Sequence, residues 1–169
     1  MARQVTLKGT PLSLEGPELK VGDKAPDATL KKSLVDTFRI SEGRGHVRLI
    51  SVVPSLDTPV CAQQTKRFNE EAAKLPNVQF YTVSVDLPPA QNRFCSTEGI
   101  DKERLTVLSD HYDCSFGKAY GTLIPDLRIE CRALFVLDKD DMIRYAEYVP
   151  EVAEHPNYDA ALNVLKSLA

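Results

Sequence analysis

The sequence predicts an α/β protein with a central mixed β-sheet flanked by helices. Strand-like apolar runs alternate with helical segments along most of the chain, which is the pattern of an α/β fold. Two apolar runs near the C-terminus are joined by only four turn residues, Asp138-Lys139-Asp140-Asp141. A parallel connection needs about a dozen residues or more, so these two strands must be antiparallel. The chain has 169 residues, and we expect one domain over residues 1–169.

The N-terminal residues predict a short β-hairpin. Alternating apolar residues flank the segment Lys8-Gly9-Thr10-Pro11, which places Gly9 at the turn. Residues 16–26 are punctuated by Gly and Pro and are expected to be irregular.

The remaining elements follow from apolar periodicity and from the positions of Gly and Pro. Residues 46–53 are mostly aliphatic between Gly45 and Pro54, which predicts a strand buried on both faces. The other expected elements, in chain order, are a helix over 59–74, a strand over 78–86, a helix over 89–97, a strand over 105–108, a helix over 115–120, strands over 133–137 and 142–149, and a helix over 158–168.

Charge and composition exclude several classes of function. Lys and Arg number 21 against 24 Asp and Glu, and no basic cluster exceeds Lys31-Lys32, so nucleic acid and anionic membranes are not expected partners. The longest strongly apolar run, residues 49–53, is far shorter than the roughly 20 residues that span a bilayer. The first residues hold no signal-peptide core, and the four cysteines are too sparse for a secreted disulfide framework. We therefore expect a cytoplasmic protein.

The segment from Pro54 to Cys61 carries the chemistry. A buried strand ends there, a tight loop follows and a helix begins. Asp57 or Thr58 can cap this helix, and Pro59 suits its first position. Cys61 then lies in the first turn, where unpaired N–H groups and the helix macrodipole favour a thiolate over a thiol.

Residues in this segment and elsewhere resemble a known family. Pro54, Thr58 and Cys61 match the P-x-x-x-T-x-x-C motif of peroxiredoxins, and the segment VGDKAPD at 21–27 is similar to that family's N-terminal entry segment. The likeness is closer to one subfamily, the bacterial thiol peroxidases, also described as atypical two-cysteine peroxiredoxins. It rests on the N-terminal hairpin, on Val85-Asp86-Leu87-Pro88 before Arg93-Phe94-Cys95, and on Arg132 ahead of residues 133–138, and it runs over essentially the whole chain.

This resemblance implies a thioredoxin-like fold and a peroxidase that reduces hydrogen peroxide and organic hydroperoxides. By resemblance, Cys61 is the peroxidatic cysteine, which becomes a sulfenic acid, and Cys95 is the resolving cysteine of the same chain. Thr58 and Arg132 would orient the sulfur and the peroxide, and Pro54 would shield the pocket from water. The family relies on thioredoxin as reductant, without metal, haem or flavin, and the resemblance suggests a homodimer.

Elementary chemistry supports part of this reading. Ionising a thiol at neutral pH gains at most roughly 30-fold in rate, about 2 kcal/mol, so a fast thiol enzyme must also stabilise its transition state. Thr58, backbone amides and an arginine can supply the hydrogen bonds. A disulfide needs Cα atoms about 4.4 to 6.8 Å apart, and both Cys61 and Cys95 lie on expected helices. We therefore predict that one or both helices unwind locally in each cycle, with low stability over residues 88–99.

The other cysteines and the histidines are expected to be structural or incidental. Cys114 and Cys131 have no counterpart in the family pattern, and strand alternation should point Cys131 away from its neighbour Arg132 and from Cys61. The three histidines have no ligand spacing, which argues against zinc. No C-x-x-C is present, which argues against a thioredoxin-type exchanger.

Two alternatives remain open at this point. A peroxide-sensing protein could use the same cysteine pair as a switch, and a thioredoxin-like scaffold could hold structural cysteines only. Continuous peroxide-dependent turnover distinguishes the enzyme from both.

Overall fold

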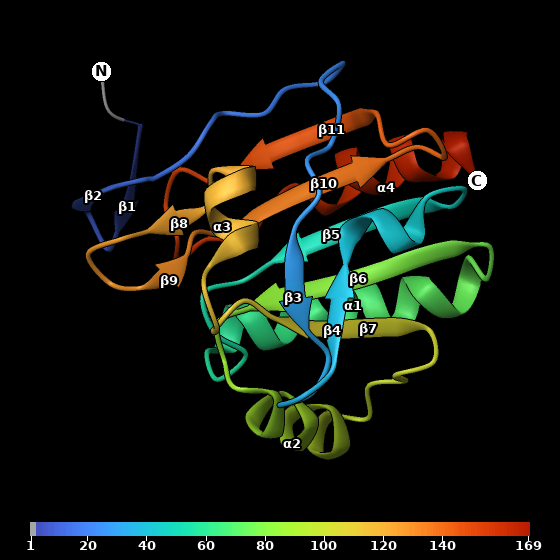
Figure 1. Cartoon of the computed structure of the whole chain (residues 1–169), viewed down its shortest axis with the longest axis horizontal. Helices are drawn as coiled ribbons and strands as arrows, with labels where there is room; N and C mark the ends of the chain where they lie inside the picture. Colours follow the sequence, from blue (N-terminus) through green and yellow to red (C-terminus); the bar gives the residue numbers. More distant parts are fainter. Residues whose placement is uncertain (1–2) are drawn as a thin grey trace.

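A computed structural model describes residues 3–169 and contains a central seven-stranded mixed sheet (Figure 1). In spatial order its strands are β11 (Ile143–Tyr148), β10 (Ala133–Leu137), β5 (Val47–Val52), β6 (Val78–Ser84), β7 (Leu105–Ser109), β3 (Thr29–Lys31) and β4 (Thr37–Arg39). Strands β5, β6 and β7 are parallel, whereas every other pairing in this sheet is antiparallel. The predicted mixed sheet and its antiparallel C-terminal pair are confirmed.

Helices cover both faces of the sheet. Their bounds are η1 (Ile40–Gly43, a 3₁₀ helix), α1 (Pro59–Lys74), α2 (Pro88–Glu98), α3 (Ser115–Tyr120) and α4 (Tyr158–Leu168). In Figure 1, α1 and α4 lie behind the sheet and α3 lies in front. Successive side chains of β10 point to opposite faces of the sheet, so the strand contributes to the hydrophobic core on each face. Leu134 and Val136 pack with residues of α1 and α4, while Phe135 packs with residues of α3. Cover on both faces explains why β5 and β10 are buried at every position.

The predicted helices agree closely with the structure. α1, α3 and α4 have the predicted bounds, and α2 extends one residue further at each end than the predicted 89–97. The N-terminal hairpin is confirmed as β1 (Gln4–Leu7) paired with β2 (Thr10–Ser13), and Gly9 takes φ +85° in the turn. Within residues 3–169, no helix is both long and apolar enough to cross a lipid bilayer.

Four short strands were absent from the sequence prediction. β3 and β4 extend the sheet at the β7 edge, and β8 (Leu123–Ile124) pairs with β9 (Ile129–Glu130). Each has only two or three residues. In β3 and β4 only Leu30 and Phe38 are buried, so these strands carry no alternation long enough to read.

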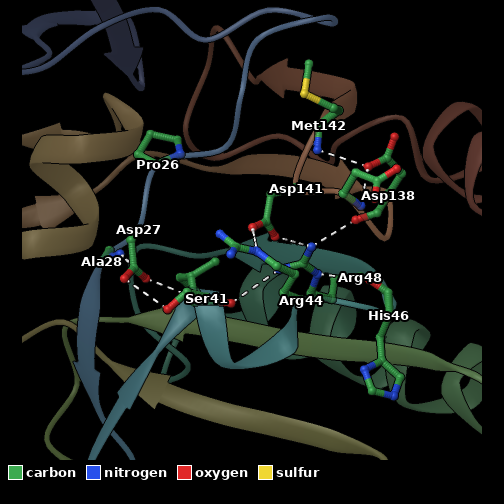
Figure 2. Close-up of polar contacts among 12 residues, drawn as sticks. Pro26, Asp27, Ala28, Ser41, Arg44, His46, Arg48, Asp138, Asp141 and Met142 are labelled. Atoms are coloured by element: carbon green, nitrogen blue, oxygen red, sulfur yellow. Dashed lines mark hydrogen bonds and ion pairs between the residues drawn. The ribbon is translucent and has the colours of Figure 1, made fainter.

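An ion cluster, in which Arg48 and Asp141 are buried and Arg44 is exposed, stabilises the end of the sheet at which β5 begins (Figure 2). The Asp141 carboxylate accepts hydrogen bonds from Arg48 Nη2 at 2.5 Å and from Arg44 Nε at 2.6 Å. The fully buried Arg48 also donates to three backbone carbonyl groups, those of Ile40, His46 and Asp138. This cluster ties η1, β5 and the β10–β11 turn together.

Candidate active site

The loop between β5 and α1 places Cys61 in the first helical turn. Thr58 is the N-cap residue, with φ −118° and ψ 150°, and its Oγ1 accepts a hydrogen bond from Cys61 N at 3.4 Å. Pro59 occupies the first helical position, as expected. Of the two capping candidates the structure selects Thr58, and Asp57 is exposed. Pro54 is buried in the same loop.

The Cys61 side chain is fully buried. It packs with Val53 and Leu56, and Phe94 and Val107 lie against this cluster. Apolar surroundings disfavour a charged sulfur, so stabilisation of a thiolate here must come from polar groups aimed at it.

Arg132, directly before β10, supplies such a group. Its Nη2 lies 3.4 Å from Cys61 Sγ, its Nη1 donates to Gln64 Oε1 at 3.0 Å, and its Nε donates to the Val152 carbonyl oxygen at 3.0 Å. The residue is 2% exposed. No carboxylate of residues 3–169 lies within 4.0 Å of this guanidinium. The Cys61 sulfur is the group that Nη2 contacts in this buried arrangement.

Sequence reasoning missed Gln64, which orients Arg132. Its Nε2 donates to Ser51 Oγ at 2.7 Å, and this bond turns the amide oxygen toward Arg132. Gln64 lies three residues after Cys61 and therefore on the same face of α1. A polar residue three positions after Cys61 on a buried helix face was the sequence feature that could have identified Gln64 as part of the site.

Sequence reasoning also assigned no role to Asp86, which holds the loop before Cys61. Its carboxylate accepts hydrogen bonds from Ser55 Oγ at 2.7 Å, from Leu56 N at 2.8 Å and from Ser84 Oγ at 2.7 Å. Asp86 follows β6, the parallel neighbour of β5. Chain segments after adjacent parallel strands meet at one sheet edge, which was the signal that could have linked Asp86 to the loop.

Cys95 lies on α2 and is 2% exposed. Burial raises the pKa of the Cys95 thiol, and the Lys102 charge offsets part of that rise. Cys61 and Cys95 are both free thiols in this structure, and they pack in different apolar clusters.

A pocket of about 530 Å³ lies between the 55–57 loop and α2. Residues from both segments line it: Ser55, Leu56, Asp57, Asp86, Ala90, Arg93, Phe94, Thr97 and Glu98. The structure thus brings Thr58 and Arg132 onto Cys61, and it keeps Cys95 on the helix that forms the other side of the pocket.

The two remaining cysteines lie elsewhere. Cys131 is buried in the core on the Phe135 side of the sheet, so the expectation that it points away from Cys61 is confirmed. Burial raises the pKa of the Cys131 thiol to about 12. Cys114 is buried at the N-cap of α3, and burial also raises the pKa of its thiol. Among the described residues, no three His, Cys, Asp or Glu side chains are grouped so as to hold a metal ion.

Comparisons with known proteins place the chain in a family. The Redoxin family model matches residues 20–162. A thiol peroxidase of Bacillus subtilis (strain 168) is 50% identical over 165 residues, which cover 98% of each chain. A peroxiredoxin-like protein from Aquifex aeolicus is 44% identical, with a TM-score of 0.91 over 100% of this chain and 99% of that chain. A thiol peroxidase from Chromobacterium violaceum, at 20% identity and a TM-score of 0.84 over 97% of this chain and 95% of that chain, shows the same fold. The chain therefore belongs to the redoxin family, among the bacterial thiol peroxidases, which are enzymes of the peroxiredoxin type with a thioredoxin-like fold.

Proposed function

We propose that this enzyme reduces hydrogen peroxide and organic hydroperoxides with Cys61 as the peroxidatic cysteine and Cys95 as the resolving cysteine. The observation that carries the proposal is the contact of 3.4 Å between Arg132 Nη2 and Cys61 Sγ, in a buried position at a helix start. A cation beside a cysteine in the first helical turn favours the thiolate, which is the nucleophile.

In the first step the Cys61 thiolate attacks the terminal peroxide oxygen. An S–O bond forms, the O–O bond breaks, and the leaving oxygen takes a proton to become water or an alcohol. The sulfur becomes a sulfenic acid. Negative charge moves from the sulfur to the leaving oxygen, and the guanidinium of Arg132 can donate to both. Thr58 fixes the backbone of the first turn, and Pro54 helps to exclude water from the loop.

In the second step the Cys95 thiol attacks the sulfenic sulfur. The S–S bond forms, the S–O bond breaks, and the hydroxyl group leaves with the thiol proton as water. Thioredoxin then reduces the disulfide by dithiol exchange, which returns both thiols and leaves thioredoxin oxidised. We further propose one domain over the whole chain, a homodimer and a cytoplasmic location, and equilibrium sedimentation tests the dimer directly.

A coupled assay tests the function. Reduced protein is mixed with thioredoxin, thioredoxin reductase and NADPH, peroxide is added, and the loss of NADPH is followed. Continuous turnover supports the enzyme. A single stoichiometric loss of thiol would support the alternative, a peroxide-sensing switch that uses the same cysteines.

Two variants test the cysteine roles. Cys61→Ser should abolish peroxide consumption, whereas Cys95→Ser should consume one equivalent and accumulate sulfenic acid. Mass spectrometry of the peroxide-treated wild type should show an intrachain Cys61–Cys95 disulfide. Mainly interchain dimers on a non-reducing gel would contradict the role given to Cys95.

A further inference from the structure

Helix α2 packs on the rest of the protein through a narrow stripe of buried side chains along one face. Its buried residues are Pro88, Gln91 and Cys95, which share one helix face, and Phe94 packs beside them partly buried. Gln91 is therefore the one buried side chain in this helix that can attach it through amide hydrogen bonds.

Gln91 bonds α2 to two strands. Its Nε2 donates to the Leu108 carbonyl oxygen at 2.9 Å, on β7, and to Ser84 Oγ at 3.1 Å, on β6. The residue is 2% exposed, and its Oε1 is buried without a hydrogen-bond partner among residues 3–169. Burial of an unpaired carbonyl oxygen costs free energy, so this attachment is specific but weak.

The same bonds reach the loop before Cys61. Ser84 Oγ accepts from Gln91 and donates to Asp86 Oδ2, and Asp86 holds the loop through Leu56 N. Asp86 holds the loop through its own bonds to Ser55 Oγ and Leu56 N, which do not involve Gln91, so loss of the Gln91 donor should leave the loop in place.

Cys95 lies one helical turn after Gln91, on the same face. Its thiol is buried within an apolar cluster separate from that of Cys61. Burial raises the pKa of this thiol, so it stays protonated and poorly nucleophilic while α2 is closed. Attack on the Cys61 sulfenic acid therefore requires α2 to leave its place.

We propose that Gln91 is a positioning residue that sets the rate of disulfide formation, because its amide bonds to Ser84 and Leu108 hold α2 closed and keep Cys95 away from Cys61. This inference rests on the proposed function, in which Cys95 condenses with the Cys61 sulfenic acid. The reaction itself is unchanged: the Gln91 amide donates to Ser84 and Leu108, and it acts through the position of the helix.

The experiment compares Gln91→Ala and Gln91→Met with the wild type. The methionine keeps the side-chain volume and removes both donors, so it decides the outcome should the alanine variant fold poorly. Asn92→Ala is the matched control, because Asn92 is an exposed amide on the same helix, and its side chain accepts from the exposed Lys102. Each protein is mixed with hydrogen peroxide, acid-quenched at millisecond intervals, and resolved by mass spectrometry into thiol, sulfenic acid and disulfide forms.

We expect the Gln91 variants to form the disulfide about tenfold faster, with the rate of Cys61 oxidation unchanged. Amide exchange over residues 92–98 should become about tenfold faster by the same argument, with α1 unaffected. A merely structural defect would not accelerate one chemical step alone. Asn92→Ala should match the wild type.

An unchanged or slower disulfide step in Gln91→Met would overturn the inference, and so would faster amide exchange without a faster disulfide step. Failure of the proposed function is seen separately, in the wild type. If peroxide oxidises wild-type Cys61 and no Cys61–Cys95 disulfide follows, the resolving role of Cys95 is wrong, and the inference about Gln91 falls with it.

Discussion

The guanidinium of Arg132 lies 3.4 Å from the sulfur of Cys61, and neither side chain is more than 2% exposed. A buried cation without a counter-ion is costly, and no carboxylate of residues 3–169 forms an ion pair with Arg132. If Cys61 is the peroxidatic cysteine, as we propose, its thiolate would balance this charge, and the same guanidinium would donate to the transition state.

Replacing Arg132 by lysine should lower the second-order rate of peroxide reduction by about 10²- to 10³-fold. A lysine keeps the charge but cannot bond Cys61, Gln64 and Val152 at once, because its single nitrogen lacks the guanidinium fork. Competition against a peroxidase of known rate measures the effect. Arg144→Lys, at an exposed arginine of β11, is the control. A loss of less than about threefold in Arg132→Lys would show that charge alone suffices.

Asp86→Asn should loosen the loop before Cys61. An asparagine has one acceptor oxygen, so it cannot accept from Ser55, Leu56 and Ser84 as the carboxylate does. We expect about a tenfold slower reaction with peroxide and a loss of about 1 to 2 kcal/mol in unfolding free energy. Stopped-flow competition and urea denaturation measure the two effects. Asp126→Asn, at an exposed carboxylate outside this pocket, should change neither, and equal effects in the two variants would refute the role of Asp86.

Asp141 should make the stability depend on acid pH. Burial alone would raise the pKa of Asp141, but hydrogen bonds and charge from Arg44 and Arg48 outweigh it and lower the pKa below 3.8. Because the folded pKa is depressed, the stabilisation is present above the unfolded value and is lost as pH falls through the folded value. Asp141→Asn should therefore cost about 3 kcal/mol at pH 7 and progressively less below about pH 4.

Urea denaturation of wild type and Asp141→Asn between pH 7 and pH 2 measures this dependence. Asp140→Asn is the control, since Asp140 is an exposed neighbour. A difference between wild type and Asp141→Asn that stays constant over the whole range would contradict the prediction.

Glu130→Gln should stabilise the protein at neutral pH. Burial raises the pKa of Glu130 well above 4.5, and the charge of Asp110 raises it further. Between the unfolded and the folded pKa only the folded state keeps the proton, so stability falls as pH rises above about 4.5. A glutamine stays neutral and can still accept from Thr122 Oγ1, and its amide N–H can replace the acid O–H that bonds Asp110.

We expect a gain in stability at pH 7 and none near pH 4. Thermal unfolding at both pH values measures it, with Glu70→Gln at an exposed site as the control. Destabilisation of Glu130→Gln at pH 7 would mean that the carboxylate is charged and paired in the fold.

The helices could be predicted from local sequence because their ends are marked locally. α1 begins at Pro59, directly after its N-cap Thr58, and α3 ends at Tyr120, directly before its C-cap Gly121 with φ +70°. Strands β3 and β4 could not be found in this way. β3 pairs with β7 through Lys31 and Ser109, and this edge contact between distant segments leaves no periodic signal in three residues.

The residues of the site also differ in how far they could be predicted from local sequence. Cys61 and Thr58 lie within one turn of helix, so local rules place them together. Arg132 reaches Cys61 only because β10 pairs antiparallel with β5, with Ala133 opposite Val52. This register depends on tertiary structure and cannot be predicted from the local sequence. From the residues alone, Arg132 looked like any arginine beside a strand, and only the family resemblance singled it out.

The pocket of about 530 Å³ draws one wall from the 55–57 loop and the other from α2. Two of its lining residues, Leu56 and Phe94, also pack in or against the Cys61 cluster. If α2 moves to deliver Cys95, as we propose, the second wall of this pocket moves with it. A second peroxide would then have no enclosed place to bind before the Cys61 sulfenic acid reacts with the Cys95 thiol. The helix that completes the cycle would in this way also guard the sulfur against irreversible overoxidation to the sulfinic acid.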